Sequence, residues 1–294
     1  QWSAVDNDGQ IINVPQADVN GNITGLVAGT YSVLITDENG CEFPIEIDIT
    51  QNEELTAQHT TSEYGIYQIS CKNSNDGSIN LVTTGGTGAY SYQWSAVDND
   101  GQTITVPQAD ANGNITGLVA GTYSVLITDE NGCEFPIEIE MTQPDQGVDI
   151  QETHSDFTGQ GVSCFGESDG FIDVTVTGGA GGYIYNWSAV DTNGQIINVP
   201  ADTDGDISGL VAGTYSLIAT DSNGCFTEIV VEITQNQELT ASETTSDFTG
   251  QGVSCFGESD GSIDLVTNGG TGVYNYQWSA VDNDGQIINV PQAD

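Results

Sequence analysis

The stretch Leu26-Val-Ala-Gly-Thr-Tyr31-Ser-Val-Leu-Ile-Thr-Asp-Glu-Asn-Gly-Cys41 decides the fold of this chain. A Leu-x-x-Gly-x-Tyr sequence followed by alternating apolar residues is typical of a tyrosine corner. At such a corner the chain crosses between the two sheets of a β-sandwich, and the Tyr hydroxyl bonds to backbone just upstream. After the corner, Tyr31, Val33 and Ile35 share one strand face by the period of two. Asp-Glu-Asn-Gly then predicts a hairpin turn. The stretch therefore predicts the last corner and last hairpin of a small sandwich.

The same stretch recurs along the chain, which indicates a tandem array. It returns as Leu118 to Cys133 and, with a few changes, as Leu210 to Cys225. The junctions at Gln51, Gln143 and Gln235 lie 92 residues apart, a period that overrides any domain count taken from length. The predicted divisions are a partial module 1–50, complete modules 51–142 and 143–234, and a partial module 235–294. Residues 277–294 repeat residues 1–18 without a change, which favours a longer parent chain.

Each module reads as seven short strands separated by turn residues, with no helical periodicity. In residues 51–142 an interrupted first strand runs to Cys71, and the paired glycines of its sister segments favour a switch between sheets. A third strand carries Trp94, as an immunoglobulin-like core requires. The predicted fold is all-β, a tandem array of immunoglobulin-like (fibronectin III-like) seven-stranded β-sandwich modules. We expect Trp94 and Trp187 to be buried against the strands that carry Tyr123 and Tyr215.

The chain is strongly acidic, because it has 43 acidic residues, a single Lys, Lys72, and no Arg. Nucleic acid is excluded as a partner, since its phosphates attract basic surfaces. The carboxylates favour solubility, or alternatively a surface that attracts divalent cations.

If the carboxylates attract divalent cations, the repeated Asp-x-Asp-Gly turns are the predicted place for a weak calcium site. They lack the first carboxylate and the distant Glu of an EF-hand, so a plain hairpin turn is the favoured interpretation. No cofactor is required by the sequence. The candidate ligands are Asp6, Asp8, Asp98, Asp100, Asp202, Asp204, Asp282 and Asp284.

The six cysteines occupy two repeated contexts, which indicates disulfides and an oxidising compartment. Zinc is disfavoured, because no Cys-x-x-Cys or His pair accompanies them. Three periodic pairings stay open. Within a module the pairs are Cys71–Cys133 and Cys164–Cys225. Across a junction they are Cys41–Cys71, Cys133–Cys164 and Cys225–Cys255. Between successive modules the pair is Cys71–Cys225.

An enzyme is not expected. The two histidines, His59 and His154, stand at non-equivalent positions of the repeat. A repeated site for His-based acid–base chemistry is therefore impossible. We interpret both as solvated strand residues.

Five motifs follow one another in a fixed order in the third module: Cys164-Phe-Gly-Glu-Ser-Asp-Gly170, Thr177-Gly-Gly179, Tyr183-Ile-Tyr-Asn-Trp187-Ser, Leu210-Val-Ala-Gly-Thr-Tyr215 and Asp221-Ser-Asn-Gly-Cys225. With these motifs the modules resemble the SprB repeat of the giant surface adhesin of gliding Bacteroidetes. The resemblance implies export by the type IX secretion system, display at the outer membrane, and a role in gliding or attachment. It brings no catalytic residues.

The expected function is a stalk or filament of a large secreted cell-surface adhesin. Its partners are neighbouring copies of the module, with the surface or polysaccharide ligand bound elsewhere in the parent and no membrane insertion here. The alternative is a set of accessory carbohydrate- or ligand-binding modules in a secreted hydrolase. That alternative needs exposed aromatics outside the core, for which Tyr64, Phe157 and Phe248 are the candidates.

Overall fold

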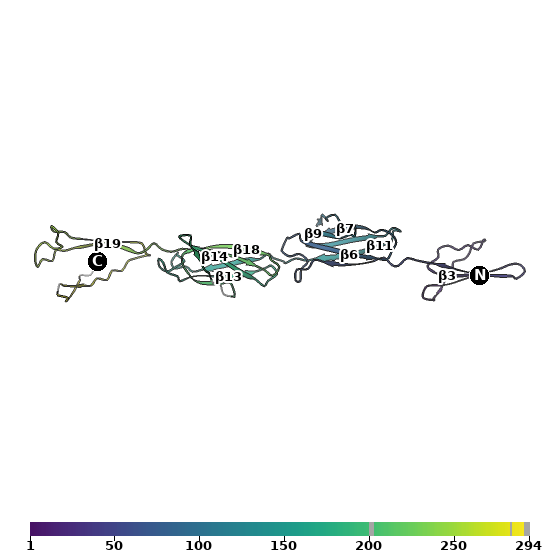
Figure 1. Ribbon diagram of the computed structural model, residues 1–294, viewed down its shortest axis with the longest axis horizontal. Helices are drawn as coiled ribbons and strands as arrows, with labels where there is room; N and C mark the ends of the chain where they lie inside the picture. The colour runs from purple at the N-terminus through teal and green to yellow at the C-terminus, as the bar shows by residue number, and fades with distance from the viewer. Residues whose placement is uncertain (200–202, 283, 291–294) are drawn as a thin grey trace. The chain divides into compact units, whose positions relative to one another are not determined.

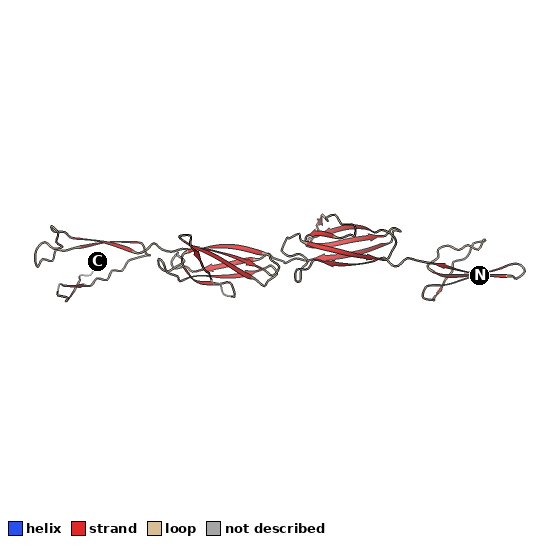
Figure 2. Cartoon of the chain, in the orientation of Figure 1, coloured by secondary structure: helices blue, strands red, loops and turns tan. Residues whose placement is uncertain are grey.

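A computed structural model describes residues 1–199, 203–282 and 284–290 of the chain. These residues form strands and connecting loops, with no helix among them (Figure 2). The chain divides into two units, Gln1–Ile69 with Asn73–Thr142, and Ser70–Lys72 with Gln143–Asp294. None of the described sheets crosses a predicted module junction.

In the first unit, residues 51–142 form a two-sheet sandwich (Figure 1). One sheet has the order β5-β6-β9 and the other β11-β10-β7-β8, which is the strand arrangement of a fibronectin III-like sandwich. The seven strands are β5 (Thr56–Thr61), β6 (Gly77–Thr84), β7 (Ser91–Val97), β8 (Thr103–Ile104), β9 (Ile115–Leu118), β10 (Gly121–Thr128) and β11 (Glu134–Met141).

In the second unit, residues 143–234 repeat this topology in the sheets β12-β13-β16 and β15-β14-β17-β18. The repetition confirms the predicted fold class. The strands are β12 (Asp149–His154), β13 (Gly170–Thr177), β14 (Ile184–Asp191), β15 (Ile196–Ile197), β16 (Ile207–Leu210), β17 (Gly213–Thr220) and β18 (Phe226–Ile233).

The two ends of the chain hold parts of the same sandwich. Residues 1–50 form one four-stranded sheet, β2-β1-β3-β4, and the described residues from 235 onward form two strand pairs. None of the described residues after Ile233 is a buried apolar residue, because the strands there have no complete facing sheet. The strands are β1 (Trp2–Val5), β2 (Ile11–Ile12), β3 (Gly29–Thr36), β4 (Glu42–Ile49), β19 (Thr240–Thr245), β20 (Ile263–Asn268), β21 (Ala280–Val281) and β22 (Ile287–Ile288).

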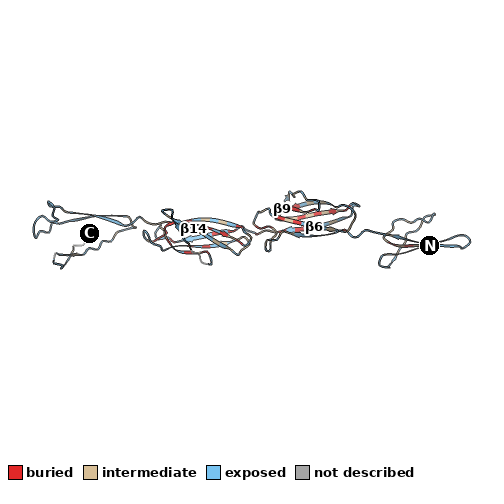
Figure 3. Cartoon of the chain, in the orientation of Figure 1, coloured by how far each residue is buried: buried red, intermediate tan, exposed pale blue. Residues whose placement is uncertain are grey.

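Alternation along the strands builds each core. On β10 the side chains of Tyr123, Val125 and Ile127 point inward and are buried, as the period of two predicts. They pack with Ile79 and Leu118 of the facing sheet. In each complete module the buried positions lie along the strands (Figure 3), so each module has its own core.

The tyrosine corner is present in every copy. The hydroxyl of Tyr31 donates to the Val27 carbonyl at 2.9 Å, that of Tyr123 to Val119 at 3.1 Å, and that of Tyr215 to Val211 at 2.9 Å. Burial raises the pKa of the Tyr123 phenol. The predicted corner is confirmed.

The prediction for the tryptophans needs correction. Trp94 and Trp187 lie on the strands beside those of Tyr123 and Tyr215, but they are half-buried rather than buried. The indole N–H of Trp94 donates to the Gly113 carbonyl at 3.0 Å, and Trp187 does the same to Gly205. The ring therefore lies at the edge of the core under a loop.

After its first strand the chain reaches the end of the other sheet, but it forms no strand of that sheet, so the predicted switch of the strand itself is not seen. After β5, the backbone N–H groups of Gln68 and Ile69 donate to the carbonyl of Thr142, just past β11 in the other sheet. Gly161 and Val162 bond in the same way to Thr234. This short segment leads directly to the first cysteine of the module.

Candidate functional site: the turn that carries the disulfide

The turn between β17 and β18 is built around one buried carboxylate, Asp221, which is 3% exposed. Its Oδ1 accepts the backbone N–H groups of Asn223 at 2.9 Å and Cys225 at 2.9 Å. Its Oδ2 accepts the N–H of Ala180 at 2.7 Å, from the Gly-Gly loop that follows β13. Asp221 therefore fixes the position of Cys225 and joins the two sheets at this end of the module.

The second glycine of the Gly-Gly pair lies against this carboxylate. Gly179 has φ +58°, and a Cβ there would lie 2.3 Å from Oδ2 of Asp221 and 2.8 Å from a methyl of Val148. Gly86 repeats the arrangement, with a Cβ position 2.9 Å from Oδ2 of Asp129. A side chain at either glycine would push the carboxylate away from the N–H groups it accepts.

We expect Gly179→Ala to destabilise this module more than Gly181→Ala. Both glycines have positive φ, at +58° and +75°, so both alanines carry the left-handed backbone cost of about 1–2 kcal/mol. Gly181 has open space around it, whereas Gly179 does not. Hydrogen exchange of β17 in the full chain measures the difference. Equal losses of stability for Gly179→Ala and Gly181→Ala would show that the Asp221 contact does not restrict residue 179.

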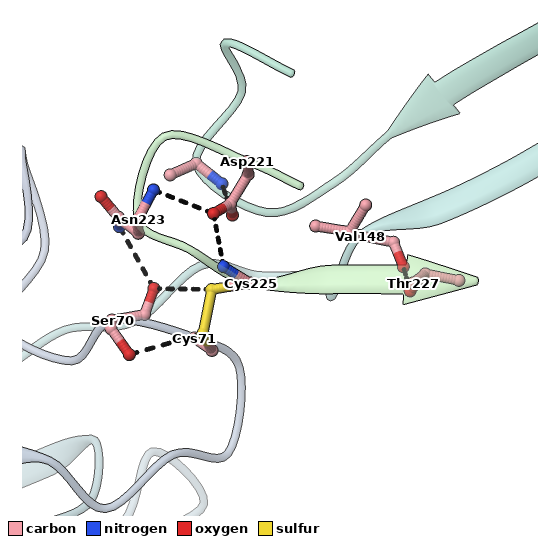
Figure 4. The surroundings of a disulfide bond; sticks show 8 residues. Ser70, Cys71, Val148, Asp221, Asn223, Cys225 and Thr227 are labelled. Carbon is pink, nitrogen blue, oxygen red and sulfur yellow. Dashed lines mark hydrogen bonds between the residues drawn. A yellow bond between two sulfur atoms is a disulfide. The ribbon is translucent and has the colours of Figure 1, made fainter. Parts of the chain in front are cut away.

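The disulfide Cys71–Cys225 lies at this turn, inside the second unit, which includes Ser70–Lys72 (Figure 4). The two Cα atoms are 5.7 Å apart. Asn223 Nδ2 donates to the Ser70 carbonyl at 3.1 Å, and Lys72 Nζ donates to the Asp145 carbonyl. The Cys225 Sγ lies 3.3 Å from the Ser70 carbonyl oxygen, which is a contact only, because a disulfide sulfur carries no proton.

Of the three pairings left open by the sequence, the structure contains the one between successive modules. The within-module and across-junction pairs are not formed among the described residues. The other cysteines are free and exposed: Cys41, Cys133, Cys164 and Cys255.

The Asp-x-Asp-Gly turns use their first carboxylate to hold backbone. Oδ1 of Asp6 accepts the N–H groups of Asp8 at 3.0 Å and Gln10 at 2.7 Å. Asp98 and Asp282 make the same pair of bonds. In the part of the chain that the structure describes, no three His, Cys, Asp or Glu side chains gather closely enough to hold a metal ion.

In the third module the hairpin turn after the Trp strand begins at an aspartate other than Asp202. The equivalent of Asp98 is Asp191, whose Oδ1 accepts Asn193 and Gln195 N–H groups. Asp204 instead belongs to the later loop that covers Trp187, and Asp202 lies outside the described residues. Both segments read Asp-Thr-x-Gly. At the true position Asn193 replaces the second carboxylate.

Calcium binding at these turns stays a prediction, and melting temperatures measured in calcium chloride and in sodium chloride at matched ionic strength test it. Screening of the acidic charge should raise the melting temperature in both salts. An additional rise in calcium would support ligation by the paired aspartates. Equal melting temperatures would leave these residues as hairpin turns.

Backbone hydrogen bonds lower the pKa of two aspartates in other turns of the repeat. The Cys133 N–H lowers the pKa of Asp129, and the Asn22 N–H lowers that of Asp18. Stability from such a carboxylate is present above its ordinary pKa and is lost as the pH falls through the lowered value. Asp129 and Asp18 therefore stabilise their own turns at neutral pH.

The histidines form no repeated site. His59 is exposed on β5, and Nδ1 of His154 lies 3.0 Å from the carboxylate of Glu152.

Comparison with protein families gives matches at three places in the chain. Residues 66–99, 160–192 and 250–283 match the SprB repeat. The chain contains three SprB-repeat matches. Each matched stretch runs from the segment before the first cysteine, through the second strand, to the Trp strand and the turn after it. The tyrosine corner and the Asn-Gly-Cys turn lie outside the SprB-repeat matches.

Similar solved structures are distant. The N-terminal eight immunoglobulin domains of Down Syndrome Cell Adhesion Molecule give a TM-score of 0.38 at 14% identity, covering 79% of this chain and 32% of that one. A tetra-tandem repeat from the extending region of a large adhesion protein gives a TM-score of 0.29 at 15% identity, covering 92% of this chain and 82% of that one. BcpA, the major pilin subunit of Bacillus cereus, gives a TM-score of 0.23 at 14% identity, covering 79% of this chain and 90% of that one.

This chain thus spans about a third of the Down Syndrome Cell Adhesion Molecule structure. These likenesses are too distant to transfer a ligand or a partner. No curated protein matches the chain. The described residues include no helix with the length and apolar character needed to cross a bilayer.

Proposed function

We propose that this chain is part of the stalk of a large secreted adhesin, where repeated modules supply length and carry load. The SprB-repeat matches support a structural repeat region of an adhesin. The proposal extends to export by the type IX secretion system, attachment at the outer membrane, and service in gliding. The ligand, a surface or a polysaccharide, is bound elsewhere in the parent.

The observation that carries the proposal is the covalent ring closed by Cys71–Cys225. The bond joins residues 154 positions apart, so the backbone between them lies inside a loop. A pull applied at the chain ends passes from residue 71 to residue 225 through the sulfur atoms. Opening of the strands inside the ring therefore adds no length. Such a bypass suits a stalk and has no use in a module that only binds a ligand.

Removal of one whole module from the parent protein tests the proposal. Deletion of residues 51–142, with deletion of 143–234 as the matched control, keeps the repeat in phase. Either deletion should shorten the reach of the surface filament by roughly 35–40 Å, a strand length plus a junction. Attachment should be unchanged. Loss of attachment with the filament still displayed would instead support the ligand-binding alternative.

A further inference from the structure

The Asn-Gly-Cys turn has the same local geometry whether or not its cysteine is bonded. Around the bonded Cys225, the backbone N–H donates to Asp221 Oδ1 at 2.9 Å. The free Cys41 and Cys133 donate to Asp37 and Asp129 at 2.7 and 2.8 Å. The turn therefore holds the backbone of each of these cysteines in the same local geometry before any disulfide is made.

The other half of the pair is also repeated. Cys164 and Cys255 follow a serine, as Cys71 does. The N–H of Ser163 donates to Asp169 Oδ1 at 3.0 Å, and Ser254 donates to Asp260 at the same distance. Each of these two cysteine carbonyls accepts a backbone N–H at 3.2 Å. The segments that carry the two thiols are thus alike and ordered by their own bonds.

The free and bonded turns differ in what covers the cysteine. Cys225 is 9% exposed beneath the Ser70–Lys72 segment, while Cys133 is exposed. The side chain of Asn223 donates to the Ser70 carbonyl, whereas its equivalent Asn131 donates to Thr87 Oγ1 at 3.1 Å in its own module. Among the described residues, no Ser-Cys segment covers Cys133 as Ser70–Lys72 covers Cys225.

We propose that every junction of this array carries the same cross-link. Cys41 and Cys133 each bond to the Ser-Cys cysteine of the module before their own. Cys164 and Cys255 each bond to the Asn-Gly-Cys cysteine of the module after their own. Each module is then tied covalently to both neighbours, and the rings overlap along the chain. The pairing rests on the geometry of this turn and not on the stalk function.

Formation of each bond is an oxidation. Two thiols lose two protons and two electrons to a disulfide oxidant, which leaves as a dithiol after thiolate attack and resolution of a mixed disulfide. The exposed thiols are accessible to such an oxidant.

A two-copy chain tests the pairing. Because residues 277–294 repeat residues 1–18, residue 294 of a first copy is joined to residue 19 of a second, which restores one 92-residue module at the join. After refolding with oxidised glutathione, non-reduced peptide mapping should find Cys164 of the first copy bonded to Cys41 of the second. It should also find Cys255 of the first copy bonded to Cys133 of the second.

The single-copy chain is the matched control, because it has the same cysteines but no following module. The Cys164–Cys41 and Cys255–Cys133 peptides should be absent from its monomer and present in the two-copy monomer. Free thiols at Cys164 and Cys255 of the first copy, or a Cys164–Cys225 pair, would overturn the proposal. Linkage found only in disulfide-bonded dimers would overturn it as well, by showing that the bonds form between chains.

Discussion

Tyr215→Ala is expected to lower the opening free energy of the β17 amides by about 3–5 kcal/mol. Tyr215 is fully buried at 0% exposure and packs in a core with Leu217 and Ile233. Truncation removes the ring and leaves a cavity that the surrounding strands can fill only in part. It also leaves the Val211 carbonyl without its 2.9 Å hydroxyl donor. Amide hydrogen exchange in the full chain gives the value module by module.

Tyr215→Phe separates the two contributions. It keeps the ring and removes only the hydrogen bond, so the opening free energy of the β17 amides should fall by about 1 kcal/mol. The β10 amides of the other complete module should be unaffected by either change, since each module has its own core. A loss as large for Phe as for Ala would show that the corner is held by the hydroxyl bond rather than by packing.

Asp221→Ala should lower the free energy of unfolding of this module by about 3 kcal/mol or more, because three backbone N–H groups then lose their carboxylate acceptor in a buried site. The three donors belong to Asn223, Cys225 and Ala180. Exchange of these three amides measures the effect directly.

Asp221→Asn is the informative partner variant. Its side-chain oxygen can still accept the Asn223 and Cys225 N–H groups, but its NH2 would face the Ala180 N–H, so two donors would meet. We expect Asp221→Asn to lower the free energy of unfolding by less than Asp221→Ala does, with the largest change in hydrogen exchange at the Ala180 amide. Equal stability for Asp and Asn would mean that the Ala180 bond contributes nothing.

Local patterns were sufficient for much of the fold. The corner at Tyr31 and the strand alternation after it depend on neighbouring residues, so the sequence predicts them. The Trp94 prediction was wrong for a physical reason. Its indole N–H needs an acceptor, and the loop carbonyl of Gly113 supplies one only at the edge of the core.

The cross-link could not be chosen from the sequence, because spacing alone allows three pairings. What decides it is tertiary structure, because the segment Ser70–Lys72 packs in the second unit beside Asn223. The role of Asp221 was also missed. The signal was present, since an Asp precedes every Asn-Gly-Cys and a Gly-Gly pair occurs in every module with a complete second strand.

Stretching the single chain by its two ends, with and without the disulfide, tests the load-bearing account most directly. With Cys71–Cys225 intact, the total length released on full unfolding should fall short of that of Cys225→Ser by roughly 500 Å, the extended length of the 154-residue separation. Cys133→Ser, which removes an equivalent free thiol, should match the unaltered chain. Equal released lengths for the unaltered chain and Cys225→Ser would contradict the account, because the load would then pass through the module backbone and not through the bond.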